Sequence, residues 1–135
     1  MGLIDISAGY AVRDPLVIRV GETFDHVFVA RSPSDGTRID LDGGSAFFQV
    51  RHRPGGYLLL SATMPNTLRL QRDYALDEVA GYSPVGVIRV VVFVPATISF
   101  RAGVYEVVAV DAANRRYIVD RGAVRFDIPV YRALS

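Results

Sequence analysis

Residues 86–111, GVIRVVVFVPATISFRAGVYEVVAVD, contain two long apolar runs that are joined through Pro95 and a corner ending at Gly103. In the first run, both faces of an extended chain would carry apolar side chains, apart from Arg89. A near-continuous apolar run of this length indicates a strand that is buried on both sides. We therefore expect the two runs to be core strands around which the other strands are arranged.

Outside this stretch, short apolar segments alternate with turn signals. Sequences rich in Gly, Pro, Asp and Ser at 32–36, 42–44 and 54–56 predict turns. No long helical crossover separates the apolar segments, which favours an all-β fold over an α/β fold. The expected architecture is an antiparallel β-sandwich of eight to nine strands. Besides the two core runs, short segments with a strand pattern occur at residues 16–20, 24–30, 38–41, 45–53, 57–63, 67–71, 117–119 and 122–130.

The segment at 24–30, FDHVFVA, has bulky side chains on both faces. Val27 and Val29 lie on one face, and two phenylalanines and His26 lie on the other. This pattern predicts an inner strand whose second face is covered by a neighbouring element or by a partner.

Two segments do not follow the strand pattern, and both are predicted to contact partners. Residues 1–14 have no sustained period of 2 or 3.6, so we expect an extended arm in front of a sandwich domain at 15–135. An arm with apolar residues usually docks on another surface, and a frayed terminus is the alternative. Residues 72–84 form an insertion, in which Asp73 begins a short helix and Gly81 ends it. The predicted contact residues are Leu3, Ile4, Ile6 and Tyr10 in the arm and Tyr74, Leu76 and Tyr82 in the insertion.

Length and composition exclude several classes of protein. A chain of 135 residues forms one domain and buries enough surface for a core. It has no cysteine, which excludes disulfides, thiol catalysis and cysteine-containing zinc sites. Fifteen basic residues, all arginine, nearly balance 14 acidic ones, so no strong field attracts nucleic acid or an anionic membrane. The arginine bias fits either a genome rich in G and C or packed interfaces that use guanidinium groups.

The chain has no predicted membrane segment and no targeting signal. Its longest apolar run, around Val90 to Val94, is interrupted by Arg89 and Pro95 and is too short to span a bilayer. The first ten residues, MGLIDISAGY, lack the features of a signal peptide, and Ile6 stands where a myristoylation signal has Ser or Thr. We therefore expect synthesis in the cytoplasm.

Candidate chemical sites are few, and each has a structural alternative. His26 and His52 have no metal-site spacing, so a zinc site would need carboxylates from distant loops. Asp40 and Asp42 offer oxygen ligands for calcium, but the loop lacks the further acidic residues of an EF-hand and fits a solvated turn. Asp73, Asp77 and Glu78 fit helix capping better than acid–base catalysis.

No known catalytic motif is present. The sequence contains no phosphate-binding glycine loop, no Ser-His-Asp order and no dinucleotide fingerprint. We therefore predict a non-enzymatic protein with no catalytic residues, no cofactor and no metal. Nucleic-acid binding is not expected either, because the arginine clusters at 51–53 and 115–116 do not form a basic stripe.

A first resemblance concerns the fold. The pattern Gly103-x-Tyr105-x-Val107 is similar to the tyrosine corner of immunoglobulin-like domains, where a tyrosine early in a late strand bonds to upstream backbone. Phe47-Phe48-Gln49 resembles part of the central strand of such domains. The chain has neither the cysteine pair nor the tryptophan of antibody domains, so the resemblance is one of architecture.

A second resemblance covers residues 16–128. The ordered segments GETF (21–24), DGTRIDL (35–41), AFFQVR (46–51), VPA (94–96) and AGVY (102–105) resemble small immunoglobulin-like structural proteins of tailed bacteriophages. The N-terminal domains of baseplate upper proteins belong to this group. The insertion at 72–84 and the arm before Asp14 are departures from it.

The resemblance implies a virion component, assembled in the host cytoplasm, that acts by protein–protein contacts in the tail or baseplate. Its implied partners are other virion proteins and further copies of itself in a symmetric assembly, without nucleic acid or membrane. Decoration of the capsid surface is an alternative within this class. Alternatives from other classes are an accessory domain of an enzyme and a carbohydrate-binding module that uses Tyr57, Tyr74 and Tyr82.

Overall fold

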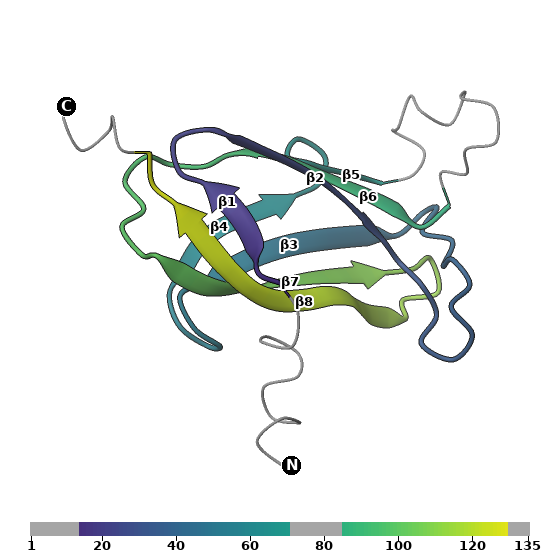
Figure 1. Ribbon diagram of the computed structural model, residues 1–135. Coiled ribbons are helices and arrows are strands. Elements are labelled where there is room, and N and C mark those ends of the chain that lie inside the picture. The colour runs from purple at the N-terminus through teal and green to yellow at the C-terminus, as the bar shows by residue number, and fades with distance from the viewer. Residues whose placement is uncertain (1–13, 71–84, 130–135) are drawn as a thin grey trace, which may run out of the picture.

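The computed structural model describes residues 14–70 and 85–129, and these residues form eight β-strands and no helix (Figure 1). The strands belong to two sheets. Sheet A has five strands in the order β1-β8-β7-β3-β4, and sheet B has three in the order β2-β6-β5. The strands are β1 (Leu16–Arg19), β2 (Thr23–Val29), β3 (Ser45–Arg51), β4 (Leu58–Thr63), β5 (Leu68–Leu70), β6 (Val87–Phe93), β7 (Ala102–Val110) and β8 (Arg116–Asp127).

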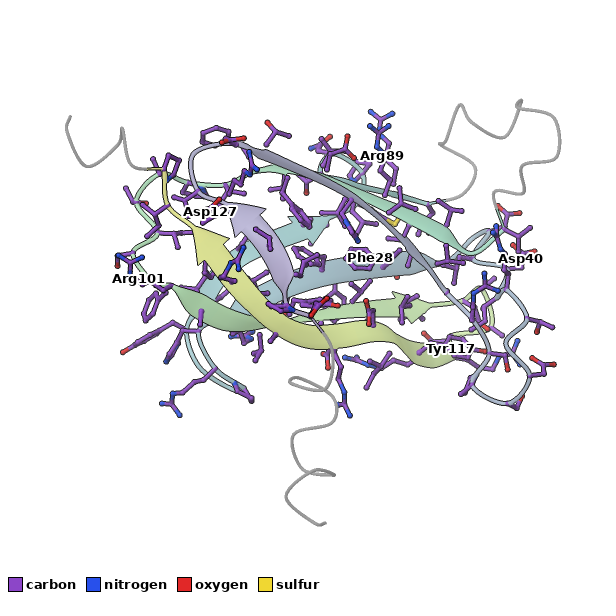
Figure 2. All side chains as sticks on the ribbon, viewed as in Figure 1. Phe28, Asp40, Arg89, Arg101, Tyr117 and Asp127 are labelled. Atoms are coloured by element: carbon purple, nitrogen blue, oxygen red, sulfur yellow. The ribbon has the colours of Figure 1, made fainter. Side chains whose placement is uncertain are left out.

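The two sheets share one hydrophobic core. Phe48 of β3 is fully buried, and its ring centroid lies 5.5 Å from that of Phe24 and 5.8 Å from that of Phe28, both on β2. Phe28 lies between the two layers in Figure 2. Contacts of this kind join the inner face of sheet A to the inner face of sheet B. The all-β class is therefore confirmed.

The two apolar runs that organise the sequence become the central strands of different sheets. β6 lies between β2 and β5, and β7 lies between β8 and β3. Positions 94–101 connect them across the end of the molecule, and the apolar residues there form no strand. Proline at position 95 fits this interruption, because it supplies no backbone N–H to a sheet.

Strand alternation explains the inner faces. In β3 the side chains at 46, 48 and 50 are buried, while those between them are half-buried or exposed. The same period appears in β5 and in the last residues of β8. Because successive side chains point to opposite faces, each of these strands contributes one apolar row to the core.

Several predicted strands are wrong in detail. The segments predicted as a final pair, 117–119 and 122–130, form the single strand β8. The strand predicted at 38–41 is reduced to one isolated bridge between Arg31 and Arg38. β2 is an edge strand of sheet B rather than an inner strand. The helix predicted to begin at Asp73 falls outside the described residues.

One pairing departs from the expected antiparallel pattern. β1 runs parallel to β8, from Leu16 opposite Val124 to Arg19 opposite Asp127. β1 has four residues and β8 has twelve, so β1 covers only the last third of that edge. The remaining strand pairs within residues 14–70 and 85–129 are antiparallel.

A buried carboxylate holds the turn between β7 and β8. Oδ1 of Asp111 accepts hydrogen bonds from the backbone N–H groups of Ala113 (3.0 Å) and Arg115 (2.8 Å). Oδ2 accepts from Nε of Arg115 (2.9 Å) and from the hydroxyl of Tyr117 (3.2 Å). These bonds, first among them the one from the Arg115 backbone, lower the pKa of Asp111. The hairpin turn predicted at 112–115 is therefore present and strongly hydrogen-bonded.

Candidate functional site

Most of the predicted contact residues fall outside the part of the chain that the structure describes. This applies to the whole arm and to the whole insertion. The residues concerned are Leu3, Ile4, Ile6, Tyr10, Tyr74, Leu76 and Tyr82. A candidate site within the described structure must therefore lie in residues 14–70 and 85–129.

Tyr105 is described and lies in the core. It is 6% exposed, and its ring is 6.1 Å from that of Phe28 and 6.3 Å from that of Phe48. Its hydroxyl donates a hydrogen bond of 2.8 Å to Oδ2 of Asp120 on β8. This partner is a downstream side chain, whereas the tyrosine-corner prediction concerns upstream backbone. Tyr105 therefore links β7 to β8 within sheet A.

The outer face of sheet B carries exposed apolar side chains. Val27 of β2 is 40% exposed, and Val91 and Phe93 of β6 are 36% and 60% exposed. Because these positions alternate with buried ones, all three point away from the core. We call Val27, Val91 and Phe93 the sheet B patch. The sequence predicts burial on both faces of β6, but at the outward positions the structure buries Val87 and leaves Val91 and Phe93 exposed.

A bidentate ion pair lies within the sheet B patch. Nε and Nη2 of Arg89 donate to the two carboxylate oxygens of Asp25, at 2.9 and 2.6 Å. Figure 2 shows Arg89 projecting outward from sheet B. The hydrogen bonds from Arg89 hold the pKa of Asp25 below its usual value, so the pair stays charged at neutral pH. The Asp25–Arg89 pair places two charged groups beside the apolar side chains, and such groups can orient a partner.

A second exposed feature is a stack of three rings at one end of the molecule. The ring of His52 lies 5.0 Å from that of Tyr57 and 5.1 Å from that of Phe100, with interplanar angles of 29° and 27°. Tyr57 is 75% exposed and Phe100 is 39% exposed. We call these three residues the ring stack. The sequence singles out Tyr57 as a candidate sugar-binding aromatic, but it does not indicate the other two members.

Both ring nitrogens of His52 contact its own hairpin. Its Nδ1 accepts a hydrogen bond of 2.8 Å from the backbone N–H of Tyr57. Nε of Arg53 lies 3.1 Å from Nε2, within hydrogen-bond distance. His52 is thus anchored to the backbone of its own hairpin and lies against the neighbouring guanidinium.

The surface of the described residues includes two hollows, lined by side chains that do not form a recognisable catalytic arrangement. The smaller, of about 160 Å³, lies on the outer face of sheet A against Gln49, Arg51 and Glu106. The larger, of about 500 Å³, is an open groove beside β1 and β2 that includes His26. Burial lowers the pKa of His26, while the nearby carboxylates of Asp120 and Asp25 oppose this shift. His26 is therefore neutral at pH 7.

The candidate calcium ligands are engaged in a turn. Oδ1 of Asp40 accepts a hydrogen bond of 3.0 Å from the backbone N–H of Asp42. Among residues 14–70 and 85–129, no group of three or more His, Asp or Glu side chains is placed to hold a metal ion. In the same ranges, no helix is long and apolar enough to cross a membrane.

Comparisons with known proteins find similar solved structures. No family model matches the chain, and no curated protein matches it. A solved structure of a mutant SrpA adhesin from Streptococcus sanguinis is similar over 89% of this chain and 58% of that chain, so the chain spans less than two thirds of the neighbour's length. The identity is 18% and the TM-score is 0.43. A likeness at this level does not identify a function.

Proposed function

We propose that this protein is a non-enzymatic structural module of a bacteriophage virion, located in the tail or baseplate, and that it acts by binding other proteins. The phage context is supported by the ordered motifs between residues 16 and 128 that resemble such modules. The mode of action is supported by the sheet B patch.

The strand order supports an immunoglobulin-like topology. If β1 to β8 correspond to strands A, B, C, C′, D, E, F and G, sheet B contains B, E and D, and sheet A contains G, F, C and C′. The first strand then lies beside G instead of B, as the parallel pairing of β1 with β8 requires. This correspondence agrees with the sequence resemblance and adds to the proposal that the chain is an immunoglobulin-like building block.

The observation that carries the proposal is the exposure of Val27, Val91 and Phe93 on one sheet face. Clustered exposed apolar side chains often mark an interaction site, and a central aromatic residue often dominates the binding energy. The Asp25–Arg89 pair within the patch supplies orientation. In a particle with many copies, modest contacts of this kind combine into stable attachment.

A pair of matched variants tests the patch. We expect Phe93→Ser to reduce incorporation of the full-length, tagged chain into phage particles, measured by quantitative mass spectrometry of purified particles. The control is Ile118→Ser, which removes a 55% exposed side chain from β8 in sheet A. Equal incorporation of the two variants would contradict a role for the sheet B patch, and failure of the unmodified chain to enter any particle would contradict the virion proposal.

The arm gives a second, independent test. We propose that Leu3, Ile4, Ile6 and Tyr10 anchor the module, because an extended apolar segment can add a strand to a neighbour's sheet. Deletion of residues 2–12 is expected to abolish incorporation and to leave the circular dichroism spectrum unchanged. Normal assembly of the shortened chain would show that the arm is not the anchor. Imaging of the labelled protein on intact particles distinguishes tail or baseplate attachment from capsid decoration.

A further inference from the structure

In the ring stack, Tyr57 is held against His52 although it contributes little to the packing of the fold. The innermost contact of the stack, between Phe100 and His52, joins the 94–101 connection to the β3–β4 hairpin. Tyr57 is stacked on His52 but remains 75% exposed, so it buries little surface on folding. A large aromatic side chain held in place and left mostly open to solvent is suited to contact a ligand.

The hairpin itself holds the central ring of the stack in place. The hydrogen bond from the Tyr57 backbone fixes the His52 ring. Gly56 lies directly against this ring, since a Cβ at position 56 would be only 2.3 Å from His52 Cε1. The backbone of the hairpin and the imidazole therefore hold each other in position. Such preorganisation lowers the entropy cost of binding.

The two segments that build the stack carry charge of one sign. These segments, 52–57 and 94–101, contain Arg53 and Arg101 and no acidic residue. Within the described part of the chain, neither arginine forms an ion pair with a carboxylate. Figure 2 shows Arg101 at this end of the molecule, away from Asp40 and Tyr117 at the other end. An exposed guanidinium is suited to bind a carboxylate through two parallel hydrogen bonds.

We propose that the ring stack is a binding site for an acidic saccharide, a pyranose that carries a carboxylate. The apolar C–H face of the sugar packs on the free face of the Tyr57 ring. Nε of Arg53 lies against His52, so the terminal nitrogens of this guanidinium bind the carboxylate, and Arg101 adds positive potential. This function is separate from the protein contacts of the sheet B patch, and it would allow the module to attach to a glycan surface.

Single-stranded nucleic acid also combines stacking with arginine contacts, but the surface favours a saccharide. Binding of a nucleic-acid strand uses a basic groove that follows several phosphates, with successive aromatic rings for successive bases. Here one ring, Tyr57, is largely exposed, and the adjoining segments supply two guanidinium groups. The protein as a whole has a formal net charge of only +1.

A glycan array with matched pairs tests the proposal. The full-length chain is applied to uronate and sialate oligosaccharides, each printed beside its methyl ester, together with neutral glycans and a thymidine oligonucleotide. We expect binding to at least one acidic glycan and weaker binding to its ester. Absence of binding to every acidic glycan would overturn the proposal. Equal binding of acid and ester, or equally strong binding of the oligonucleotide, would overturn it as well.

Calorimetric titration of the best-bound acid and its ester assigns the residues. Tyr57→Ala is expected to lower the affinity by about tenfold or more, as for a central aromatic contact. Arg53→Gln is expected to lower the affinity for the acid by roughly fivefold and to leave that for the ester unchanged, because only the acid presents a charge. Ile118→Ala is the control: it removes a 55% exposed apolar side chain of β8 outside the ring stack and is expected to leave glycan affinity unchanged. Unchanged binding by Tyr57→Ala, with a native circular dichroism spectrum, would exclude the site without affecting the virion proposal.

Discussion

The outer faces of both sheets contain a phenylalanine and a valine that differ in solvent exposure. On sheet A, Phe47 is half-buried beneath the guanidinium of Arg116, which lies 5.7 Å from the ring centroid, and Val108 opposite it is fully buried. On sheet B, Phe93 and Val91 are exposed. The outward-facing Phe47 and Val108 are thus structural residues, whereas the outward-facing Phe93 and Val91 are candidate binding residues. The difference depends on which side chains the neighbouring strands supply.

The largest expected effect comes from placing a charge on each face. Val108→Asp should lower the free energy of unfolding by about 3–5 kcal/mol, because it buries a carboxylate without a partner. Val91→Asp should lower it by less than about 1 kcal/mol, because the new carboxylate reaches water. Urea denaturation of both variants measures the difference. Similar losses would mean that the two faces are equally buried.

Truncation of the two outward phenylalanines gives a smaller contrast. Phe47→Ala should cost about 2 kcal/mol, from lost burial and from loss of the contact with Arg116. Phe93→Ala should cost at most about 0.5 kcal/mol, since its ring is 60% exposed. Thermal unfolding of the two variants side by side checks this order. A larger loss for Phe93→Ala would assign that ring to stability instead of binding.

The smallest expected effect concerns the ion pair on sheet B. Asp25→Asn should lower the free energy of unfolding by only about 0.5 kcal/mol, because the side chains of Asp25 and Arg89 are 45% and 41% exposed and solvent screens the pair. The folded-state pKa of Asp25 lies below the ordinary value, so the unfolded state binds more protons in acid. The stabilisation is therefore present above the ordinary pKa of aspartate and disappears as the pH falls through the folded pKa. Unfolding measured from pH 7 to pH 2 should show the two proteins converging in acid, and a difference that persists at pH 2 would contradict this account.

The strands of the core were largely predictable because alternation is a local property. Thr67 to Gln71 alternates in the sequence, and β5 occupies its centre, Leu68–Leu70. The corner at Pro95 also follows from local chemistry, since proline cannot donate a hydrogen bond to a sheet. The sequence predicted that the second face of the strand at 24–30 is covered by a neighbouring element or a partner. That face includes Val27, which belongs to the sheet B patch and is 40% exposed. The prediction was wrong about the position of this strand, which lies at an edge.

The ring stack could be predicted only in part. Tyr57 was visible as an aromatic residue next to a Pro-Gly-Gly turn, and this context indicates a loop. Its partner His52 lies on the same hairpin, but Phe100 is far away in the chain and arrives through the connection from sheet B to sheet A. No periodic pattern in the sequence indicates that His52 and Phe100 come into contact. The predicted contacts in the arm and the insertion stay predictions.

From the sequence alone, the all-β class, the two core runs and most strand positions were determined, because strand formation and inward burial depend on side chains two residues apart. Tertiary structure alone decided that β1 lies parallel to β8, that Val108 is covered and that Val91 and Phe93 are not. These outcomes depend on which strands become neighbours and on what each neighbour places over the outer face. Such contacts join residues far apart in the chain, so no local pattern encodes them.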